Sequence, residues 1–526
     1  MVSLPAKKRS DRGSQESLVA AMMDPGFYPK PPREVTHKET HISHLFFAGD
    51  LVYKVKKAVR FPFLDYSTIN KRRYFLHEEM RLNRRLAPSV YLAVLSISSD
   101  CFGWHLGGDD PAVEYALVMR RLPEKRMLDF LLESGQATGE MMRSLAGILA
   151  PFHSHARKVK AAEPARYPEF VKKLWTENLA DVEPFLDGLM SADTFHAIRE
   201  FGIEFVERRN ELFARRASEG WIRDVHGDLH CEHVCFAPEG IQIFDCIEFS
   251  AKFRCCDIAA EIAFLLMDLE SRGAGALAGE FLARYLALTG DGELTRLLPF
   301  YKCYRALVRG KVEALRSRRA EASRYFRLAA RVIWEPVKPF VLIVGGLTGS
   351  GKSTLARELG ERLGMPVISS DAVRKTLAGA VGSRAVPFGA GVYSAAMTEK
   401  TYAEMAREAE RQIAIGTGAI LDATFSQRVE RERIARMAEK HQAPLAVVLC
   451  RASEETVRKR LARRAAEGRD LSDGRWEIYV EQKAKFQPFE EMPTSLELDT
   501  DDSMEQLARK CEKFLRSRLS EPGAQV

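Results

Sequence analysis

The sequence has 526 residues, of which 46% are hydrophobic and 29% charged, and its formal net charge is +7. This composition is typical of a globular chain of about two to four domains, and it excludes an intrinsically disordered or fibrous protein. No apolar run approaches the roughly 18 residues that a membrane-spanning helix needs, so no membrane contact is expected.

The N-terminal segment is polar and lacks the apolar core of a secretory signal, so residues 1–25 are predicted to form a disordered tail. Nine cysteines are scattered along the whole chain. Their odd number and irregular spacing favour a reducing cytoplasm over a disulfide framework.

The first structured region is predicted at 35–57, where apolar and polar residues alternate on both sides of a Gly-Asp turn and indicate a β-hairpin. Lys54 and Lys56 share one face of its second strand. A helix is expected over about 67–86, ended by a following proline, and a further strand over 114–119.

The region 127–216 has a helical pattern with breaks at glycine and proline, and a different pattern follows over 225–249. There, two short apolar strands flank a Pro-Glu-Gly turn, which places Asp228 and Asp245 at opposite ends of one hairpin. Two carboxylates held in this way can act on one substrate. One accepts a hydroxyl proton, and the other binds Mg²⁺, which prefers oxygen ligands.

Cys231, His233 and Cys235 lie close together inside this segment and raise the alternative of a metal clip. The clip is disfavoured, because alternate residues of a short β-like segment rarely converge on one ion. In addition, no second cysteine or histidine pair stands at zinc spacing.

Two helical patterns follow this segment. An apolar helix is expected over 257–269, with Asp257 capping its first turn or tying down the preceding loop. The stretch 305–331 carries many arginines and lysines, for which a solvated helical face is favoured over an anionic-substrate or RNA surface. A short, proline-rich linker is expected at 334–339.

The most specific motif of the chain is a phosphate-binding loop at 340–354. An apolar strand enters a glycine-rich turn with the spacing G-x-x-x-x-G-K-[ST], whose fixed positions are Gly346, Gly351, Lys352 and Ser353. Glycines let backbone N–H groups surround an anion. Lys352 is then placed to reach the β- and γ-phosphates of ATP, and Ser353 to complete a Mg²⁺ shell. The other phosphate contacts are expected from Thr348, Gly349, Ser350 and Thr354.

Further polar residues follow the strands predicted after this loop. Asp371 and Arg374 come after the second strand, where ligands of open α/β sheets bind. Asp371 is expected to act as a base or hold a hydroxyl, and Arg374 to hold an anionic group. Asp422 ends a third strand and is placed to contact Mg²⁺ through water. Arg460 and Arg464 lie on a helix that is predicted to form a lid over the transferred phosphoryl group, with a solvated face as the alternative.

Several segments together resemble a known combination of two kinase domains. HGDLH at 226–230, followed by a strand, a turn and an apolar-Asp pair, is similar to the catalytic segment of the aminoglycoside phosphotransferase and protein-kinase-like superfamily. The second part resembles polynucleotide-kinase-like and zeta-toxin-like P-loop kinases. The resemblance is closest to bacterial fusions of the two, and it extends over nearly the whole chain through AGDLVYKVKK, LDYST, RLNRRLAP, LAPFHSHA, FDCIEF, SSDAVRK and ILDATF.

This resemblance implies roles for single residues of the first domain. Asp228 matches the catalytic base, and Asp245 matches the metal-binding aspartate opposite the phosphates. Lys54 looks like the strand lysine that holds the α- and β-phosphates, with a solvated strand lysine as the alternative. Its helix partner is expected to be Glu78 rather than Glu79.

His233 departs from the superfamily pattern, which has an asparagine on the second Mg²⁺ at this position. Imidazole is a poor ligand for Mg²⁺. The resemblance therefore leaves three alternatives for the first domain: one metal, another metal, or nucleotide binding without phosphate transfer.

The sequence thus predicts an α+β protein-kinase-like domain at 26–333 and an α/β P-loop kinase domain with a parallel sheet at 340–522. We expect a bifunctional, cytoplasmic phosphotransferase that uses ATP and Mg²⁺ and an unidentified hydroxyl acceptor. One alternative is a nucleotide sensor whose first domain is a pseudokinase that gates the second. Another is an RNA-end or nucleotide-repair kinase, although nucleic acid is not the favoured partner.

Overall fold

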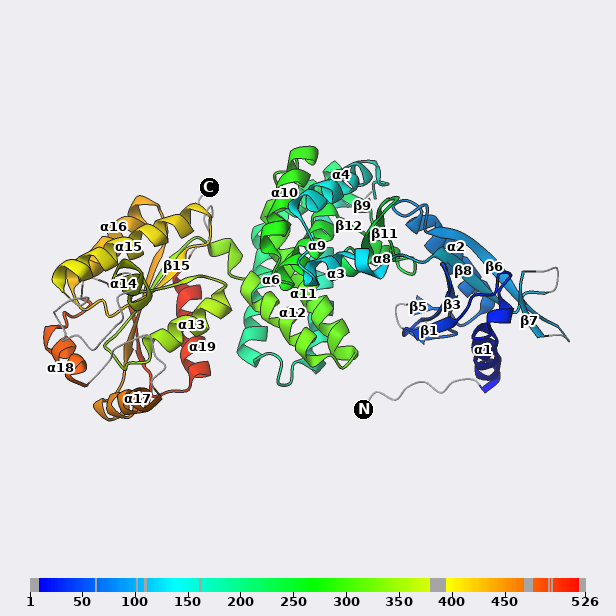
Figure 1. Cartoon of the computed structure of the whole chain (residues 1–526). Helices are drawn as coiled ribbons and strands as arrows, with labels where there is room; N and C mark the ends of the chain where they lie inside the picture. The colour runs from blue at the N-terminus through cyan, green and yellow to red at the C-terminus, as the bar shows by residue number, and fades with distance from the viewer. Residues whose placement is uncertain are drawn as a thin grey trace. The chain divides into compact units, whose positions relative to one another are not determined.

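The computed structural model describes residues 9–61, 64–100, 103–107, 111–159, 163–378, 394–467, 476–490, 492 and 495–519. Contacts divide the chain into two units, residues up to 189 with 199–326, and 190–198 with 327 onward. The first unit contains an antiparallel sheet and a helical region, and the second contains a parallel sheet with helices around it (Figure 1). This confirms the predicted pair of fold classes. None of the helices in these ranges combines the length and the apolarity that crossing a bilayer requires.

A six-stranded antiparallel sheet opens the first unit, in the order β1-β2-β3-β8-β6-β7. The predicted hairpin is confirmed as β2 and β3, with Lys54 opposite Leu45 and Lys56 opposite Ser43. Strands β1, β6 and β7 are not among the strands predicted from the sequence. The strands are β1 (Val35–Glu39), β2 (Ser43–Ala48), β3 (Leu51–Lys56), β6 (Tyr91–Asp100), β7 (Gly103–Leu106) and β8 (Glu114–Arg120).

Helices cover both faces of this sheet. Helix α1 (Arg9–Met22) packs on one face, where Leu18 and Met22 join the hydrophobic core. Helix α2 (Ile69–Asn83) packs on the other face through Leu76. Figure 1 shows the two helices on opposite sides of the strands. Because strand side chains alternate, Lys54 and Lys56 both point toward α2.

The predicted disordered tail at 1–25 is wrong for the residues that α1 contains. The segment is polar on average, but one face of the helix is apolar. On this face the exposed fractions of Leu18 and Met22 are 3% and 0%. In addition, the side-chain amide of Gln15 donates to Glu114 at 3.1 Å and to the carbonyl of Lys56 at 3.2 Å. Contacts with the sheet therefore hold this segment in place, as they do for most short helices.

The chain between 124 and 332 is mainly helical, with short two-stranded ladders. The α-helices are α3 (Leu128–Glu133), α4 (Gly139–His155), α5 (Tyr167–Val182), α6 (Ala192–Arg208), α7 (Asn210–Glu219), α8 (Ala251–Arg254), α9 (Ile258–Ser271), α10 (Gly275–Thr289), α11 (Leu294–Leu315) and α12 (Arg319–Val332). The two-stranded ladders of the unit are β4 (Arg60–Phe61) with β5 (Leu64–Asp65), β9 (Ile222–Asp224) with β12 (Cys255–Asp257), and β10 (Val234–Ala237) with β11 (Gly240–Ile243). The last of these is the predicted hairpin between the two aspartates.

Short 3₁₀ helices connect several of these elements. They are η1 (Pro25–Phe27), η2 (Glu124–Arg126), η3 (Pro164–Arg166), η4 (Glu183–Phe185), η5 (Cys231–His233) and η6 (Glu335–Val337). Of these, η5 carries His233 and directly precedes β10.

Helix α9 is the central helix of this region, since every residue from Ile258 to Leu269 is buried. Asp257 caps it by accepting a hydrogen bond from the backbone N–H of Ala259 at 2.8 Å, as predicted. The same carboxylate binds Arg216 at 2.9 Å, and Arg216 also binds Asp291 at 2.7 Å. A fully buried cation thus joins α7, the cap of α9 and the turn before α11.

The basic stretch at 305–331 does not form one solvated face. Arg305 and Arg309 on α11 are buried, with 8% and 5% exposure. Arg305 lies over the ring of Phe264 at 4.6 Å, and Arg309 donates to Glu313 at 3.0 Å. The favoured interpretation is therefore wrong for these two arginines, because α11 packs against the buried helix α9 and turns them inward.

The second unit is built on a parallel sheet in the order β14-β15-β13-β16-β17. Its strands are β13 (Val341–Gly345), β14 (Val367–Ser369), β15 (Ala419–Asp422), β16 (Leu445–Arg451) and β17 (Ser495–Asp499). The fifth strand was not predicted. The helices are α13 (Lys352–Leu363), α14 (Ser370–Ala378), α15 (Ala395–Ala414), α16 (Arg428–Lys440), α17 (Glu454–Glu467), α18 (Trp476–Lys485) and α19 (Met504–Arg518).

Both faces of this parallel sheet are covered, which explains why its strands are continuously apolar. On one face, Leu342 packs into a core with α13 and α19, and on the other face Ile343 packs into a core with α15 and α16. Trp334, in the expected linker, is also buried in the first of these cores.

We predict that Arg216→Ala lowers the free energy of unfolding by about 3–5 kcal/mol, because it leaves the buried carboxylates of Asp257 and Asp291 without a cation. The neighbouring Arg215 is 45% exposed and pairs with Glu293 at the surface, so Arg215→Ala should change it by less than about 0.5 kcal/mol. Urea unfolding of the full-length proteins measures both values. Equal values would mean that the buried cation does not stabilise the fold.

Candidate active sites

Lys54 on β3 lies at the centre of the first candidate site. Its Nζ donates to Oε1 of Glu79 on α2 at 2.7 Å and to Oδ1 of Asp245 at 3.2 Å. Burial opposes the charge of this lysine, but Asp245 and Glu79 outweigh burial and hold the pKa of Lys54 well above its usual value. The alternative of a solvated strand lysine is therefore wrong.

The helix partner of Lys54 is Glu79, and the prediction of Glu78 is wrong. Successive helix residues are about 100° apart, so only one of the two glutamates can face the sheet. Glu79 has no exposed surface, whereas the side chain of Glu78 is 24% exposed and pairs with Arg81 at 2.7 Å. The spacing of Leu76 and Glu79 on one helix face was the available signal, since these residues are three positions apart.

Lys56 belongs to the same ion cluster, which the sequence analysis missed. Its fully buried Nζ donates to Oε2 of Glu79 at 2.7 Å and to Oε1 of Glu248 at 2.6 Å. The hydroxyl of Tyr66 lies 3.2 Å from the same Nζ. Two lysines and two glutamates thus neutralise one another beneath the site.

The loop that carries Asp228 is held by a buried acid on α9. Glu261 accepts hydrogen bonds from the backbone N–H groups of His226 at 3.0 Å and Gly227 at 2.6 Å. His153 contacts the same carboxylate through Nε2 at 3.1 Å. Glu261, rather than Asp257, therefore ties down this loop.

His226 connects the loop to the far end of the hairpin. Its Nε2 lies 2.9 Å from the carbonyl oxygen of Phe244, and its Nδ1 accepts from the backbone N–H of Asp228 at 3.3 Å. These partners assign the proton to Nε2. Burial lowers the pKa of His226 to about 4, so the ring is neutral at physiological pH.

Asp228, His233 and Asp245 converge at this point, as the sequence predicted for the two aspartates. His233 Nδ1 lies 2.9 Å from the carbonyl oxygen of Asp228, and its Nε2 lies 3.5 Å from Oδ2 of Asp245. Asp245 has a positive φ of 63°, which is unfavourable for a residue with a side chain and occurs preferentially at functional sites.

Both aspartates are ionised. Burial raises the pKa of Asp228, but His230 and His233 outweigh it and bring the pKa below its usual value. For Asp245, whose side chain is 47% exposed, desolvation of its inner part raises the pKa, but the charge of Lys54 outweighs this effect and brings the pKa below its usual value. An ionised Asp228 can accept a hydrogen bond from a hydroxyl group, and an ionised Asp245 can bind a cation.

The described residues group metal-capable side chains differently from the clip considered above. Asp228, His230 and His233 offer ligand atoms that lie within 4.8 Å of one another. Cys235 is unsuited to metal binding, because burial raises its pKa to about 12 and leaves a neutral thiol.

The second candidate site is the loop between β13 and α13. Gly346 has a φ of 147°, and a Cβ there would lie only 2.5 Å from the carbonyl oxygen of Cys450, so no larger residue fits. Gly351, with a φ of 88°, precedes α13, which begins at Lys352. Lys352 and Ser353 thus start a helix whose N-terminal partial charge favours an anion.

Asp422, the predicted Mg²⁺ residue, ends β15 beside this loop and is 4% exposed. Its register places it opposite Ser369 on β14. Burial raises the pKa of Asp422, and Lys352 together with the hydroxyls of Ser353 and Ser369 opposes this effect. Its Oδ1 has no hydrogen-bond partner in the described part of the chain. A buried carboxylate oxygen of this kind, near a serine hydroxyl, is a donor set that fits Mg²⁺.

Asp371 and Arg374 lie together at the start of α14. Arg374 donates to Oδ1 of Asp371 at 3.0 Å, and their side chains are 12% and 29% exposed. The sequence analysis gave these residues separate roles toward a substrate. In this structure they form one ion pair, directly after the carboxyl end of β14.

Arg460 lies on α17 and contacts the phosphate-binding loop from behind. It donates to Oγ1 of Thr500 at 2.9 Å, to the carbonyl of Thr500 at 2.6 Å and to the carbonyl of Gly349 at 3.4 Å. It would have to leave these contacts to reach a phosphoryl group. Arg464 is half-buried on the same helix, and the remainder of the expected lid, at 468–473, lies outside the described residues.

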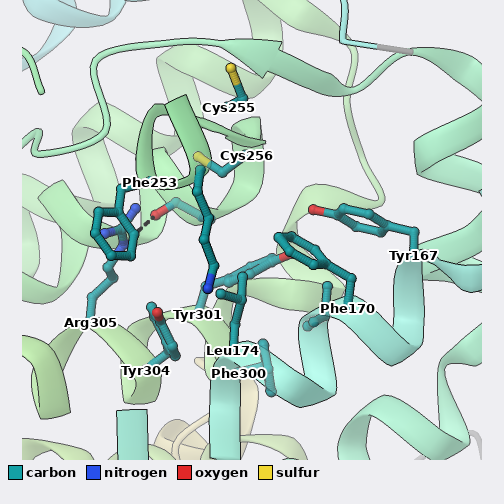
Figure 2. A pocket seen from close by; sticks show the side chains of 13 residues that line it. Tyr167, Phe170, Leu174, Phe253, Cys255, Cys256, Phe300, Tyr301, Tyr304 and Arg305 are labelled. Carbon is teal, nitrogen blue, oxygen red and sulfur yellow. Dashed lines mark hydrogen bonds between the residues drawn. The ribbon is translucent and has the colours of Figure 1, made fainter. Parts of the chain in front are cut away.

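A small pocket lies in the helical region of the first unit. Figure 2 shows Tyr167, Phe170 and Tyr304 around it, with Arg305 nearby. Its volume of about 50 Å³ has room for one or two water molecules. The residues that line it do not include either candidate catalytic aspartate of this unit. In this conformation the pocket is too small for an acceptor molecule.

Two protein families match separate parts of the chain. Residues 59–300 match the phosphotransferase enzyme family, and residues 341–489 match a family described as an AAA domain. The first match contains Asp228 and Asp245, and the second contains Lys352 and Asp422. These domains support phosphotransferase or kinase activity, and kinase-like domains imply the use of ATP, typically with Mg²⁺.

Curated relatives match over most of the chain. Uncharacterized proteins of Mycobacterium tuberculosis and Mycobacterium bovis are each 33% identical over 443 residues, which are 83% of this chain and 87% of the relative. Among solved structures, a gluconokinase from Sinorhizobium meliloti is 18% identical over 34% of this chain and 93% of its own, with a TM-score of 0.28. The Mycobacterium tuberculosis APS kinase in complex with AMPPNP and APS is 17% identical over 34% and 98%, with a TM-score of 0.27.

We predict that Glu79→Gln lowers the free energy of unfolding by about 3 kcal/mol or more, because two buried lysines lose the carboxylate that they share. Glu78→Gln should cost less than about 0.5 kcal/mol, since this glutamate forms a surface pair. Urea unfolding of the two variants gives the comparison. A larger effect for Glu78 would restore the original assignment.

A pH dependence of stability is expected from His226. Its pKa falls from 6.5 to about 4 on folding, so between these values the unfolded chain binds a proton that the folded chain does not. The contribution of this group to stability is complete above about pH 6.5 and is lost as the pH falls toward 4. In His226→Gln, the free energy of unfolding should therefore decrease less steeply as the pH falls from 6.5 to 4. The difference in slope corresponds to the uptake of up to about one proton on unfolding. Urea unfolding at several pH values tests this, and parallel profiles would contradict it.

Proposed function

Because this chain belongs to the family of proteins that join a phosphotransferase domain to a P-loop kinase domain, we propose that it is a bifunctional ATP-dependent phosphotransferase. Each domain binds one ATP and transfers the γ-phosphate to a hydroxyl group of a small molecule or nucleotide. The setting is the cytoplasm, in keeping with cysteines that are free thiols throughout the described part of the chain.

The observation that carries this proposal is the convergence of three charged groups from distant parts of the first unit. Lys54 comes from the sheet, Asp228 from the loop after β9, and Asp245 from the end of the β10-β11 hairpin. Lys54 and Asp245 are in direct contact at 3.2 Å, and His233 lies within 3.6 Å of both aspartates. A cation for phosphate, a carboxylate for metal and a carboxylate for a hydroxyl are the parts that phosphoryl transfer needs.

In the first domain, Lys54 binds the α- and β-phosphates and Asp228 orients the acceptor hydroxyl. The acceptor oxygen forms a bond to the γ-phosphorus while the bond between this phosphorus and the β,γ-bridging oxygen breaks. The hydroxyl proton passes to Asp228, and ADP leaves with the electron pair of the broken bond. A divalent metal ion, which Asp245 would hold, would supply positive charge for the phosphate oxygens.

In the second domain, the backbone N–H groups of the loop and Lys352 bind the phosphates. Ser353 and Asp422 would hold Mg²⁺, which the unpaired Oδ1 of Asp422 supports. Asp371 accepts the acceptor proton after its pair with Arg374 opens, and Arg374 then holds an anionic group of the acceptor. Arg460 holds the loop through its contact with the carbonyl of Gly349, and Arg464 contributes positive charge from the same helix.

One alternative has support from a specific residue. His233 stands where the superfamily has an asparagine on a second metal, and this departure supports a nucleotide sensor in the first domain as the alternative. The RNA-kinase alternative is weaker, because Arg305 and Arg309 are buried and give no surface for a phosphate backbone.

We predict two independent nucleotide sites, each with its own product. Calorimetry with a non-hydrolysable ATP analogue should find two analogues per chain, one of which is lost in Lys352→Ala.

Labelled ATP in cell extract should give two kinds of phosphorylated product. Asp228→Asn should reduce one product and Asp371→Asn the other, each by about 10²- to 10⁴-fold with nucleotide binding retained.

The matched controls for this experiment are the same two variants measured against the other product, whose amount should not change. One bound analogue in the unmodified chain, abolished by Lys352→Ala alone, would reject the two-site proposal. Two bound analogues with a product lost only in Asp371→Asn would reject catalysis in the first domain and favour the sensor.

A further inference from the structure

We propose that Nε2 of His233 and Oδ2 of Asp245 bind a borderline divalent cation of the d-block, such as Co²⁺ or Zn²⁺, and more weakly the harder Mn²⁺, together with the phosphates of the nucleotide. The proposal rests on the proposed function, because the nucleotide supplies the remaining oxygen ligands. It assigns to the first domain a metal preference that differs from the Mg²⁺ preference of the P-loop domain.

Asp228 fixes the orientation of the His233 ring. Its Nδ1 faces two oxygens of Asp228, the carbonyl oxygen at 2.9 Å and the carboxylate Oδ2 at 3.6 Å, so the ring proton lies on Nδ1. Nε2, the other ring nitrogen, faces the carboxylate of Asp245 and is the nitrogen that can bind a metal ion. Metal-binding histidines have this arrangement, in which the second nitrogen donates to a backbone carbonyl and thereby fixes the orientation of the ring.

The distance between the two proposed ligand atoms also fits a shared metal ion. Nε2 of His233 and Oδ2 of Asp245 lie 3.5 Å apart. Ligands at 2.0–2.2 Å from a tetrahedral metal lie about 3.4 Å apart, so the observed separation accommodates a cation without movement of either side chain. A charge-assisted hydrogen bond would bring the two atoms closer, to about 2.7–2.9 Å.

The two carboxylate oxygens of Asp245 face different groups. Lys54 donates to Oδ1, which leaves Oδ2 for a second cation. The side chain of Asp245 is 47% exposed and that of His233 is 13% exposed, so a metal can approach from the side on which the carboxylate is open. A nitrogen ligand beside a carboxylate favours Co²⁺ or Zn²⁺, and to a smaller extent Mn²⁺, over Mg²⁺, whose site is normally all oxygen.

A neighbouring grouping gives a competing arrangement, with Asp228, His230 and His233 around one ion. It is disfavoured because it needs Nδ1 of His233 as a ligand, and this nitrogen is engaged with the carbonyl of Asp228. It would also occupy the carboxylate that is proposed to accept the acceptor proton. The two arrangements differ in whether His230 binds the metal.

The test is pulsed electron paramagnetic resonance of Mn²⁺ with a non-hydrolysable ATP analogue bound to the full-length chain carrying Lys352→Ala. The first site should show hyperfine coupling to a histidine nitrogen. Growth on ¹⁵N-labelled histidine should change this coupling in the otherwise unmodified site, which requires no further substitution. Residual Mn²⁺ at the P-loop would not interfere, because Ser353 and Asp422 offer only oxygen.

Two variants make the assignment specific. His233→Asn should remove the nitrogen coupling and weaken Mn²⁺ relative to Mg²⁺ by roughly tenfold or more, with analogue binding retained. His230→Gln should keep the coupling, and its loss in that variant would support the competing arrangement and overturn this one. Bound Mn²⁺ and analogue without any nitrogen coupling would also overturn it. A chain that binds no analogue at this site fails at the earlier step and would reject the proposed function instead.

Discussion

The carboxylate of Glu79 is the group on which the first candidate site depends. It lies without solvent exposure between the ammonium groups of Lys54 and Lys56, two alternate positions of one strand, and Glu248 neutralises the second lysine. Charges at this depth are tolerated only when they are paired. Helix α2 is therefore held in one position relative to β3, because a shift along either element would leave a buried charge alone. This fixes Lys54 where it can reach Asp245.

The opposite wall of the site follows the same physical rule with different groups. Glu261 is buried on α9, where the backbone N–H groups of His226 and Gly227 satisfy it, and it thereby sets the path of the loop that presents Asp228. His226 then joins this loop to Phe244, one residue before Asp245. The two candidate aspartates are thus positioned by buried polar contacts, and each partner would be costly to leave unsatisfied.

The two candidate phosphate sites are built by different means. The first uses side chains that meet from the sheet, a loop and a hairpin, so its charge pattern depends on three long-range contacts. The second uses a strand, six loop residues and the start of a helix, where positive φ angles at Gly346 and Gly351 turn the backbone itself. Buried ion pairs are sensitive to any shift between elements, whereas a glycine loop is defined within one stretch of sequence. This difference also decides what can be predicted.

By itself the sequence determined both fold classes, the hairpins around Lys54 and between the two aspartates, the cap at Asp257 and the phosphate-binding loop. Each of these is encoded by the spacing of neighbouring residues. Only the tertiary structure decided that Glu79 rather than Glu78 meets Lys54, that Lys56 is buried, that α1 covers the sheet, and that Arg305 and Arg309 point inward. In these cases the local pattern is compatible with two faces of a helix or strand. The face that becomes buried is chosen by a partner element far away in the sequence, because only that contact removes the apolar surface from water and supplies the opposite charge.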